Sequence, residues 1–183
     1  MKKDTIVQFV GFVTNLELPE FTPKWEQYSS RMMNKIPEPV LHQKSPEAKN
    51  KFQFISQQQI LDNSQVFDIK NEKRSSHFPE LNVKVVHTGG YIILQQLKRQ
   101  PEGDTDLKVF ALLSHDDNDL SFYSEQPYYS NLNIYQAYFE SCTYGYILEF
   151  FVPEKSASEL LLQLKARPGI ETGVYKECMV VHT

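Results

Sequence analysis

Cysteine is scarce in this chain, which contains only Cys142 and Cys178 among its 183 residues. Two cysteines do not make the disulfide framework that stabilises many small secreted domains. Both lie in apolar segments with the composition of strands, so we expect two buried, reduced thiols. This scarcity predicts a location in the cytoplasm, where thiols stay reduced.

The chain also lacks a basic excess and a long apolar run. It has 19 Lys and Arg residues against 23 Asp and Glu residues, a formal net charge of −4. No overall basic field is therefore present to attract nucleic acid or an anionic membrane. No apolar run reaches the ~18 residues that a membrane-spanning helix needs. The start of the chain contains Asp4 and Gln8 beside a short apolar run, which is a poor match to a signal peptide. We expect neither nucleic acid nor a membrane as a partner.

The common catalytic motifs are missing as well. The sequence has no GxGxxG, P-loop, HExxH, CxxC or GxSxG pattern, which argues against the usual nucleotide-binding, zinc-protease and hydrolase designs. The acidic segment SHDDNDLS, Ser114–Ser121, lacks the glycine and glutamate positions of a calcium loop, and we interpret it as a solvated turn. The sequence therefore predicts no metal site, leaves the cofactor unknown and leaves open whether the protein is an enzyme.

Aromatic residues, by contrast, are abundant, with 12 Phe and 10 Tyr. The hydrophobic share of 40% and the charged share of 23% are ordinary for a globular protein. The length suits a single domain with a sizeable core. So many rings predict a large aromatic core, or a cavity or interface lined by rings.

The first third of the chain predicts a strand followed by a helix. Thr5–Val13 is almost entirely apolar and rich in β-branched and aromatic residues, which is typical of a strand covered on both faces. Residues 22–36 predict a helix with Thr22 as its N-cap and Pro23 at its first position. Trp25 and Tyr28 begin the apolar stripe of this helix. Residues 52–56 read as a short strand, and residues 57–69 are ambiguous between helix and strand.

The middle and the end of the chain carry further elements. Residues 82–87, 91–99 and 107–114 predict three consecutive antiparallel strands, a meander. Leu132, Tyr135 and Phe139 recur at helical spacing. Residues 156–166 predict a helix with a Ser156–Glu159 capping box, between strands at 144–153 and 172–181. Its expected buried face consists of Ala157, Leu160, Leu161 and Leu164.

Both ends of the chain thus follow the order strand, helix, strand. This order is typical of ferredoxin-like α+β folds, and here it predicts βαβ units at both ends of the chain around a central antiparallel meander. We expect one α+β domain over residues 1–183, divisible into two ferredoxin-like halves at about 1–88 and 89–183.

The order of elements resembles the dimeric α+β barrel superfamily. That superfamily includes small monooxygenases and, where two ferredoxin-like halves share one chain, haem-binding enzymes. The resemblance covers most of the chain but rests on no diagnostic motif, so it transfers no catalytic residue. Its haem-binding members require an axial histidine on a helix, and none of the five histidines here lies on a convincing predicted helix.

The segment HTGGY, His87–Tyr91, allows two interpretations. A glycine pair between two strand-like runs predicts a hairpin with a primed turn, because such turns need positive φ. The alternative is one long strand with a glycine bulge, which leaves His87 and Tyr91 on the same face. We favour the hairpin over a ligand-cradling loop, because no helix follows the glycines. His87 has the right chemistry for a general base, but no carboxylate partner is identifiable nearby, and we interpret it as packed beside the turn.

Seven tyrosines gather between residues 123 and 146. Tyrosine combines apolar area with a polar tip, which suits a cavity wall or a subunit interface as well as a core layer. The first hypothesis is a binding module or enzyme with an aromatic-lined cavity for a small apolar or aromatic ligand. The alternative is a protein that works by assembly, with the tyrosine-rich surface as the interface of a homodimer. The candidate ligand-binding residues are His87, Tyr91, Gln95, Trp25, Tyr28 and Tyr135.

Overall fold

The computed structural model describes residues 6–16, 18–32, 40–44, 54–60, 83–95, 106–117, 120, 132–167 and 171–180, with part of the side chains in these ranges. Within them the chain is an α+β fold, as expected. Its helices and strands, in chain order, are β1 (Ile6–Thr14), α1 (Leu18–Met32), β2 (Val40–Lys44), β3 (Phe54–Ile60), β4 (Val83–Gln95), β5 (Asp106–Leu113), β6 (Leu132–Ala137), β7 (Tyr146–Pro153), α4 (Glu154–Lys165) and β8 (Glu171–Val180).

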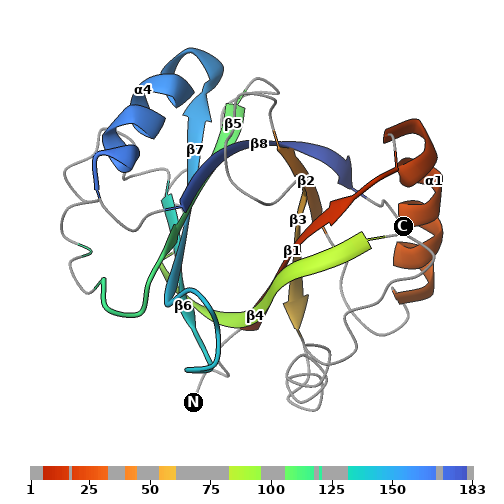
Figure 1. The fold of residues 1–183 in the computed structure, drawn as a ribbon, viewed down its shortest axis with the longest axis horizontal. Coiled ribbons are helices and arrows are strands. Elements are labelled where there is room, and N and C mark those ends of the chain that lie inside the picture. Colours follow the sequence, from red (N-terminus) through yellow and green to blue (C-terminus); the bar gives the residue numbers. More distant parts are fainter. Residues whose placement is uncertain are drawn as a thin grey trace.

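The strands form a closed barrel. Their order around it is β1-β3-β2-β8-β5-β7-β6-β4, and β4 pairs with β1 to complete the ring. Every pairing is antiparallel. Figure 1 looks into this ring and shows both helices outside it.

The barrel consists of two sets of four strands with the same neighbour order. Strands β1 to β4 lie in the order β4-β1-β3-β2, and strands β5 to β8 lie in the order β8-β5-β7-β6. In each set one helix connects two strands that flank a third, which is a ferredoxin-like arrangement. The pairs β2–β8 and β4–β6 join the two sets into one barrel.

The central meander that we expected is wrong. β4 pairs with β1 and β6, whereas β5 pairs with β7 and β8, so these consecutive strands are not neighbours. The expected division at residues 88 and 89 falls inside β4. The two strands expected at residues 82–87 and 91–99 are one strand, β4, and the sequence pattern does not show which strands pair.

The glycine pair lies within a strand and not in a hairpin turn. β4 runs through Gly89 and Gly90 without a break, and the backbone of Gly89 is not in the left-handed region. The strand has a bulge, but at Val86, because Gly11 pairs with His87 while Phe12 pairs with Val85. The single-strand alternative is therefore correct, and its bulge precedes the glycines.

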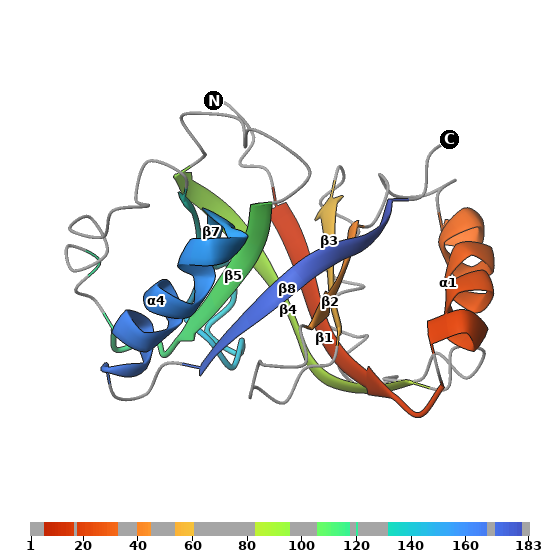
Figure 2. The ribbon, with the colours of Figure 1, turned by 90° about the horizontal axis from the view of Figure 1, so that it is seen from above.

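Helices α1 and α4 lie outside the barrel, at opposite ends of the molecule (Figure 2). The buried face of α4 is the predicted one, with Ala157, Leu160, Leu161 and Leu164 packed on outward-facing residues of β5, β6 and β7. The predicted capping box is wrong: α4 starts at Glu154, Pro153 is its N-cap, and no side chain caps it. Pro153 is the last residue of β7 and has no backbone N–H to donate, so the proline ends the strand where α4 begins.

The N-terminal helix begins earlier than its sequence signals indicate. α1 starts at Leu18, which places Pro23 inside the helix and makes the Thr22 cap wrong. Pro23 is the sixth residue of α1, past the first turn, so the helix lacks the backbone hydrogen bond that an N–H at this position would donate to the carbonyl of Pro19. Neither α1 nor α4 is long and apolar enough to cross a membrane.

The helical spacing of Leu132, Tyr135 and Phe139 is misleading, because residues 132–137 form strand β6. Leu132 and Ile134 pack under α4, whereas Tyr135 faces the other side of the sheet, so both faces of β6 are buried. The ambiguous segment after residue 56 continues strand β3 as far as Ile60, and its remaining residues lie outside the described ranges.

Candidate functional site

The inside of the barrel contains a cluster of buried rings. On β7, Leu148 and Phe150 belong to the cluster under α4, so the alternate residues Ile147 and Glu149 face inward. The inward cluster draws residues from six strands and from the loop after β6: Val7, Phe9, Ile55, Tyr91, Phe110, Leu112, Tyr135, Cys142, Tyr144 and Ile147. The barrel interior is therefore lined by buried apolar and aromatic side chains from most of its strands.

Phe9 of β1 connects the rings of this interior cluster. Its centroid lies 4.9 Å from that of Tyr135, 5.6 Å from that of Tyr91 and 6.3 Å from that of Phe110. All three pairs meet edge to face, the geometry that the ring quadrupoles favour. Tyr91 and Tyr135 are thus separate polar positions that both contact one central ring.

The first polar position is a buried carboxylate with a phenol. Glu149 is only 1% exposed, and its Oε2 accepts a hydrogen bond of 2.7 Å from the Tyr135 hydroxyl. Asn133 Nδ2 donates to the same Oε2 at 3.2 Å. The phenol oxygen also accepts hydrogen bonds from Gln57 Nε2 at 2.9 Å and from Asn133 Nδ2 at 3.3 Å. Three strands, β3, β6 and β7, thus supply one hydrogen-bonded group, here called the Glu149 network.

The Glu149 network favours the protonated phenol. Burial raises the pKa of Tyr135 well above its ordinary value, and the neighbouring Glu149 charge and its hydrogen bond raise it further. The hydrogen bonds from Gln57 and Asn133 act in the opposite direction, because they favour negative charge on the phenol oxygen. The phenol of Tyr135 therefore keeps its proton, which it donates to Glu149.

The second polar position is formed by His87 and Tyr91, both on β4. The Tyr91 hydroxyl lies 3.1 Å from His87 Nε2 and 3.1 Å from the backbone carbonyl oxygen of Tyr144. The rings of His87 and Tyr144 meet edge to face at 5.0 Å. Burial raises the pKa of Tyr91 above its ordinary range, and the charges of Cys142 and Tyr144 add to this shift. Tyr91 is therefore a neutral hydrogen-bonding group.

Gly89 makes this second position possible. A Cβ on Gly89 would lie 2.9 Å from Cε2 and 3.3 Å from Oη of Tyr91, and 3.1 Å from Cys142 Sγ. The Tyr91 ring thus lies over Gly89 and reaches back to His87. The glycine is needed for close approach of a ring, a role that a strand glycine commonly has.

The structure brings together three of the six predicted ligand-binding residues. His87, Tyr91 and Tyr135 are all buried, and the two tyrosines belong to the interior cluster. Gln95 does not lie with these three residues. A bulge at Leu94 shifts the register so that Gln95 pairs with Ile134, which belongs to the cluster packed under α4. Gln95 Nε2 donates a hydrogen bond to the backbone carbonyl of Leu132 at 3.3 Å.

The other two predicted residues lie on α1. Trp25 stacks on Phe21, which stacks on Phe54. Phe54 precedes the inward-facing Ile55 on β3, so this stack lies on the outer face of the sheet. The Tyr28 side chain lies outside the described residues.

Sequence reasoning missed the residues of the Glu149 network other than Tyr135. One signal was present: Glu149 is the only charged residue in the strand YILEFFVP. A charge in an apolar strand covered on both faces must find buried partners, which is a mark of a special position. Gln57 and Asn133 carried no comparable signal.

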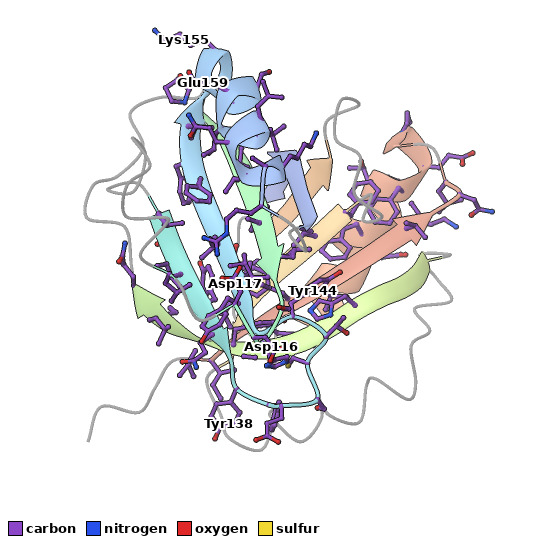
Figure 3. The ribbon with its side chains drawn as sticks, turned by 60° about the vertical axis from the view of Figure 1, so that its left-hand side comes forward. Asp116, Asp117, Tyr138, Tyr144, Lys155 and Glu159 are labelled. Carbon is purple, nitrogen blue, oxygen red and sulfur yellow. The ribbon has the colours of Figure 1, made fainter. Side chains whose placement is uncertain are left out.

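The tyrosine-rich segment divides between the inside and the surface. Tyr135 and Tyr144 are buried, whereas Tyr138 is 51% exposed. Figure 3 shows Tyr138 pointing away from the barrel at the loop after β6, while Tyr144 lies against it. Tyr123, Tyr128 and Tyr129 lie outside the described ranges.

The acidic turn after β5 has structural partners. Asp117 forms an ion pair of 3.1 Å with Arg167, which follows α4, and His115 Nε2 lies 2.6 Å from the Cys142 carbonyl oxygen. Across the described residues, no group of three or more His, Cys, Asp or Glu side chains is arranged to hold a metal ion.

Comparison with solved structures finds the same fold in proteins of very low sequence identity. An anthrone oxidase-like protein matches with a TM-score of 0.61 at 6% identity, over 100% of this chain and 95% of the other. A variant of chlorite dismutase from Candidatus Nitrospira defluvii matches with a TM-score of 0.59 at 7% identity, over 96% and 93% of the two chains. The chlorite dismutase in complex with imidazole gives 0.58 at 7% identity, over 96% and 92%. No family model and no curated protein sequence matches.

The chain has the dimeric α+β barrel fold. The resemblance inferred from the order of elements is thus confirmed at the level of fold. At these identities the likeness extends to the architecture and not to the activity.

The described helices do not carry the axial histidine that the resemblance to haem-binding members of the superfamily implies. The axial histidine of those members lies on a helix, and neither α1 nor α4 contains a histidine. Of the histidines in the described ranges, His42 and His87 lie on strands and His115 lies in a turn.

Proposed function

We propose that the interior of the barrel binds a small aromatic molecule that carries a hydroxyl or carbonyl group. The observation that carries this proposal is the Glu149 network, beside the edge-to-face rings of Phe9 and Tyr135. A core that served only stability would avoid a buried carboxylate, because its desolvation is costly. Ligand sites typically combine apolar and aromatic walls with a few well-placed polar groups.

The composition of the interior indicates the class of ligand. Aromatic edges and faces suit a flat ring system, and two separate polar positions, the Glu149 network and the His87–Tyr91 pair, suit polar substituents on it. One of the similar structures is named an anthrone oxidase-like protein, and anthrone is a tricyclic aromatic ketone. We therefore propose fused-ring phenols and ketones as ligands, bound in the cytoplasm.

Binding can be tested with 2-naphthol, 2-tetralone and fluorenone in thermal-shift and calorimetric titrations. We expect at least one of them to stabilise the protein in proportion to ligand concentration, because a ligand that binds only the folded state adds to its stability. Tyr135→Phe should weaken this binding, because it removes the phenol that holds Glu149 in place. Tyr138→Phe is the matched control, since Tyr138 is on the surface. Absence of binding by all three compounds would contradict the proposal.

A second candidate function is self-assembly. Leu94 on β4 and Tyr138 just after β6 are large apolar side chains that are 47% and 51% exposed. The Tyr138 amide donates to the Gly90 carbonyl oxygen at 2.9 Å, so this loop lies beside β4. We propose this side as the interface of a homodimer. Sedimentation of the pure protein tests it: a monomer at high micromolar concentration would exclude a homodimer, and Tyr138→Ser should weaken any dimer that forms.

A further inference from the structure

The Glu149 network has the organisation of a proton-accepting site as well as a binding site. Glu149 lies on β7 between Leu148 and Phe150, both fully buried, and its own carboxylate is buried on the inner face. Its paired residue on β5 is Phe110, whose ring is part of the interior cluster. The carboxylate thus lies among rings, as does the general acid or base of several enzymes that act at neutral pH.

The hydrogen bonds around Tyr135 determine where its proton points. The phenol oxygen accepts from two amide groups, Gln57 Nε2 and Asn133 Nδ2. A hydroxyl has one proton and two acceptor positions, so with both acceptors in use its proton must lie on the third bond, toward Glu149 Oε2. Tyr135 is therefore an oriented donor that holds the carboxylate in place and supports its negative charge.

The hydrogen bonds to Glu149 are compatible with both of its protonation states. When Glu149 is ionised, Asn133 Nδ2 and the Tyr135 hydroxyl both donate to it. When Glu149 takes up a proton on its other carboxyl oxygen, Oε1, both donors to Oε2 stay in place, and the amides of Gln57 and Asn133 still donate to the phenol oxygen. No side chain has to rotate for the carboxylate to change its protonation state, which is the preorganisation that proton transfer requires.

We infer that Glu149 accepts a proton from an acidic C–H or O–H bond of the bound ligand, with Tyr135 as a positioning residue. The bond between the ligand atom and its hydrogen breaks, and the proton forms an O–H bond with the carboxylate. The electron pair stays on the ligand as an enolate or phenolate. The step is a proton transfer only and requires no oxidant or reductant. The inference rests on the proposed function and narrows it to enolisable aryl ketones and phenols.

Hydrogen–deuterium exchange at the α-carbon of 2-tetralone tests this step. The ketone is incubated with the protein in D₂O, and the loss of the α-proton signal is followed by NMR. Wild-type protein should accelerate exchange by roughly 10²-fold or more over buffer, the contribution typical of a positioned general base. Fluorenone has no α-hydrogen, so it should compete with 2-tetralone and slow the exchange without undergoing exchange itself.

The variants separate the roles of the two residues. Glu149→Gln retains an acceptor for the Tyr135 hydroxyl, but its amide cannot take up a proton as a carboxylate does. The exchange rate should therefore fall to that of buffer while 2-tetralone still binds. Tyr135→Phe should lower the rate at saturating ketone more than it changes the KM for the ketone, whereas a purely structural role would not separate the two. Glu149→Asp keeps the carboxylate one methylene shorter, and it should retain a reduced but measurable rate even if Glu149→Gln fails to fold.

The outcomes also distinguish this inference from the proposed function. If 2-tetralone binds but wild-type protein exchanges it no faster than buffer, the proton-transfer role is refuted and ligand binding stands. Exchange by folded Glu149→Gln at the wild-type rate would equally refute the assignment to Glu149. If no ketone or phenol binds, the proposed function fails and this inference fails with it.

Discussion

Gly89→Ala is the substitution that most directly tests how the interior of the barrel is built. The change adds one methyl group to a strand in which alanine is normally tolerated. Here the new Cβ would lie 2.9 Å from Tyr91 Cε2 and 3.1 Å from Cys142 Sγ. Tyr91 is fully buried, and its hydroxyl contacts His87 and the Tyr144 carbonyl oxygen, so a shift of its ring disturbs these contacts. The ring and the thiol must both give way by a few tenths of an ångström.

Three effects set the magnitude. Overpacking of a closely packed core costs about 1–3 kcal/mol. Displacing the Tyr91 hydroxyl weakens its hydrogen bonds with His87 and Tyr144, each worth about 0.5–1.5 kcal/mol net. Replacing glycine by alanine restricts the unfolded chain, which offsets these losses by about 0.4–1 kcal/mol. We expect a net loss of about 2 kcal/mol in the free energy of unfolding.

The assay is a double-mutant cycle measured by urea denaturation. Tyr91→Leu removes the ring atoms that the alanine would meet, so in that background Gly89→Ala should cost less than about 1 kcal/mol. A hairpin turn at Gly89 would instead make the alanine costly through its own backbone, independently of Tyr91. Additive effects of the two substitutions, or no effect of Gly89→Ala alone, would refute the packing of Tyr91 over this glycine.

Three further predictions concern α4 and the buried tyrosines. Leu164→Ala should lower the free energy of unfolding by roughly 2–5 kcal/mol in a denaturant melt, because Leu164 is fully buried. The matched control Leu162→Ala, at a position that is 72% exposed, should change this free energy little. Equal losses in the two variants would contradict the buried face assigned to α4. Ser156→Ala should stay within about 0.5 kcal/mol of wild type, because no side chain caps α4; a loss above 1 kcal/mol would restore the capping box. Tyr91 and Tyr135 have pKa values raised above the ordinary ~10, so their contribution to stability is complete below pH ~10 and is lost as pH rises, by about 1.4 kcal/mol per pH unit for each tyrosine. Urea melts at stepped alkaline pH check this, and stability that does not fall above pH 10 would contradict it.

The sequence predicted the buried residues most accurately for an element that is buried on one side only. The face of α4 followed from spacing alone, because one stripe of a surface helix contacts the sheet while the rest meets water. Strands were harder, because β6 and β7 are buried on both faces and show no alternation. The helical spacing of Leu132, Tyr135 and Phe139 arose by chance from such a strand.

The glycine pair shows a limit of local reasoning. Glycine serves both turns that need positive φ and places where another group must come close, and these uses look alike in one sequence. What distinguishes them here is Tyr91, whose ring occupies the space above Gly89. This contact depends on the full strand being formed.

The candidate site was predicted in part. His87, Tyr91 and Tyr135 were selected for their chemistry, and the structure places them in the interior. Glu149 was overlooked, although its partners explain how a carboxylate is retained there: Tyr135 and Asn133 come from a strand that lies next to β7. That adjacency is a property of strand order, which no local pattern contains.

The closed ring of strands has a consequence for how the chain folds. Leu41 of β2 pairs with Met179 of β8, so one of the two seams joins residues that are far apart in the chain. The entropy of closing such a long loop is lost before the contacts of the seam form. Folding is therefore slow, in the range of about milliseconds to seconds for comparable β-rich domains. Until both seams close, β2, β4, β6 and β8 are open edges that can pair with another chain. Aggregation during refolding should therefore compete with seam closure, and dilute, slow refolding should give the higher yield of native protein.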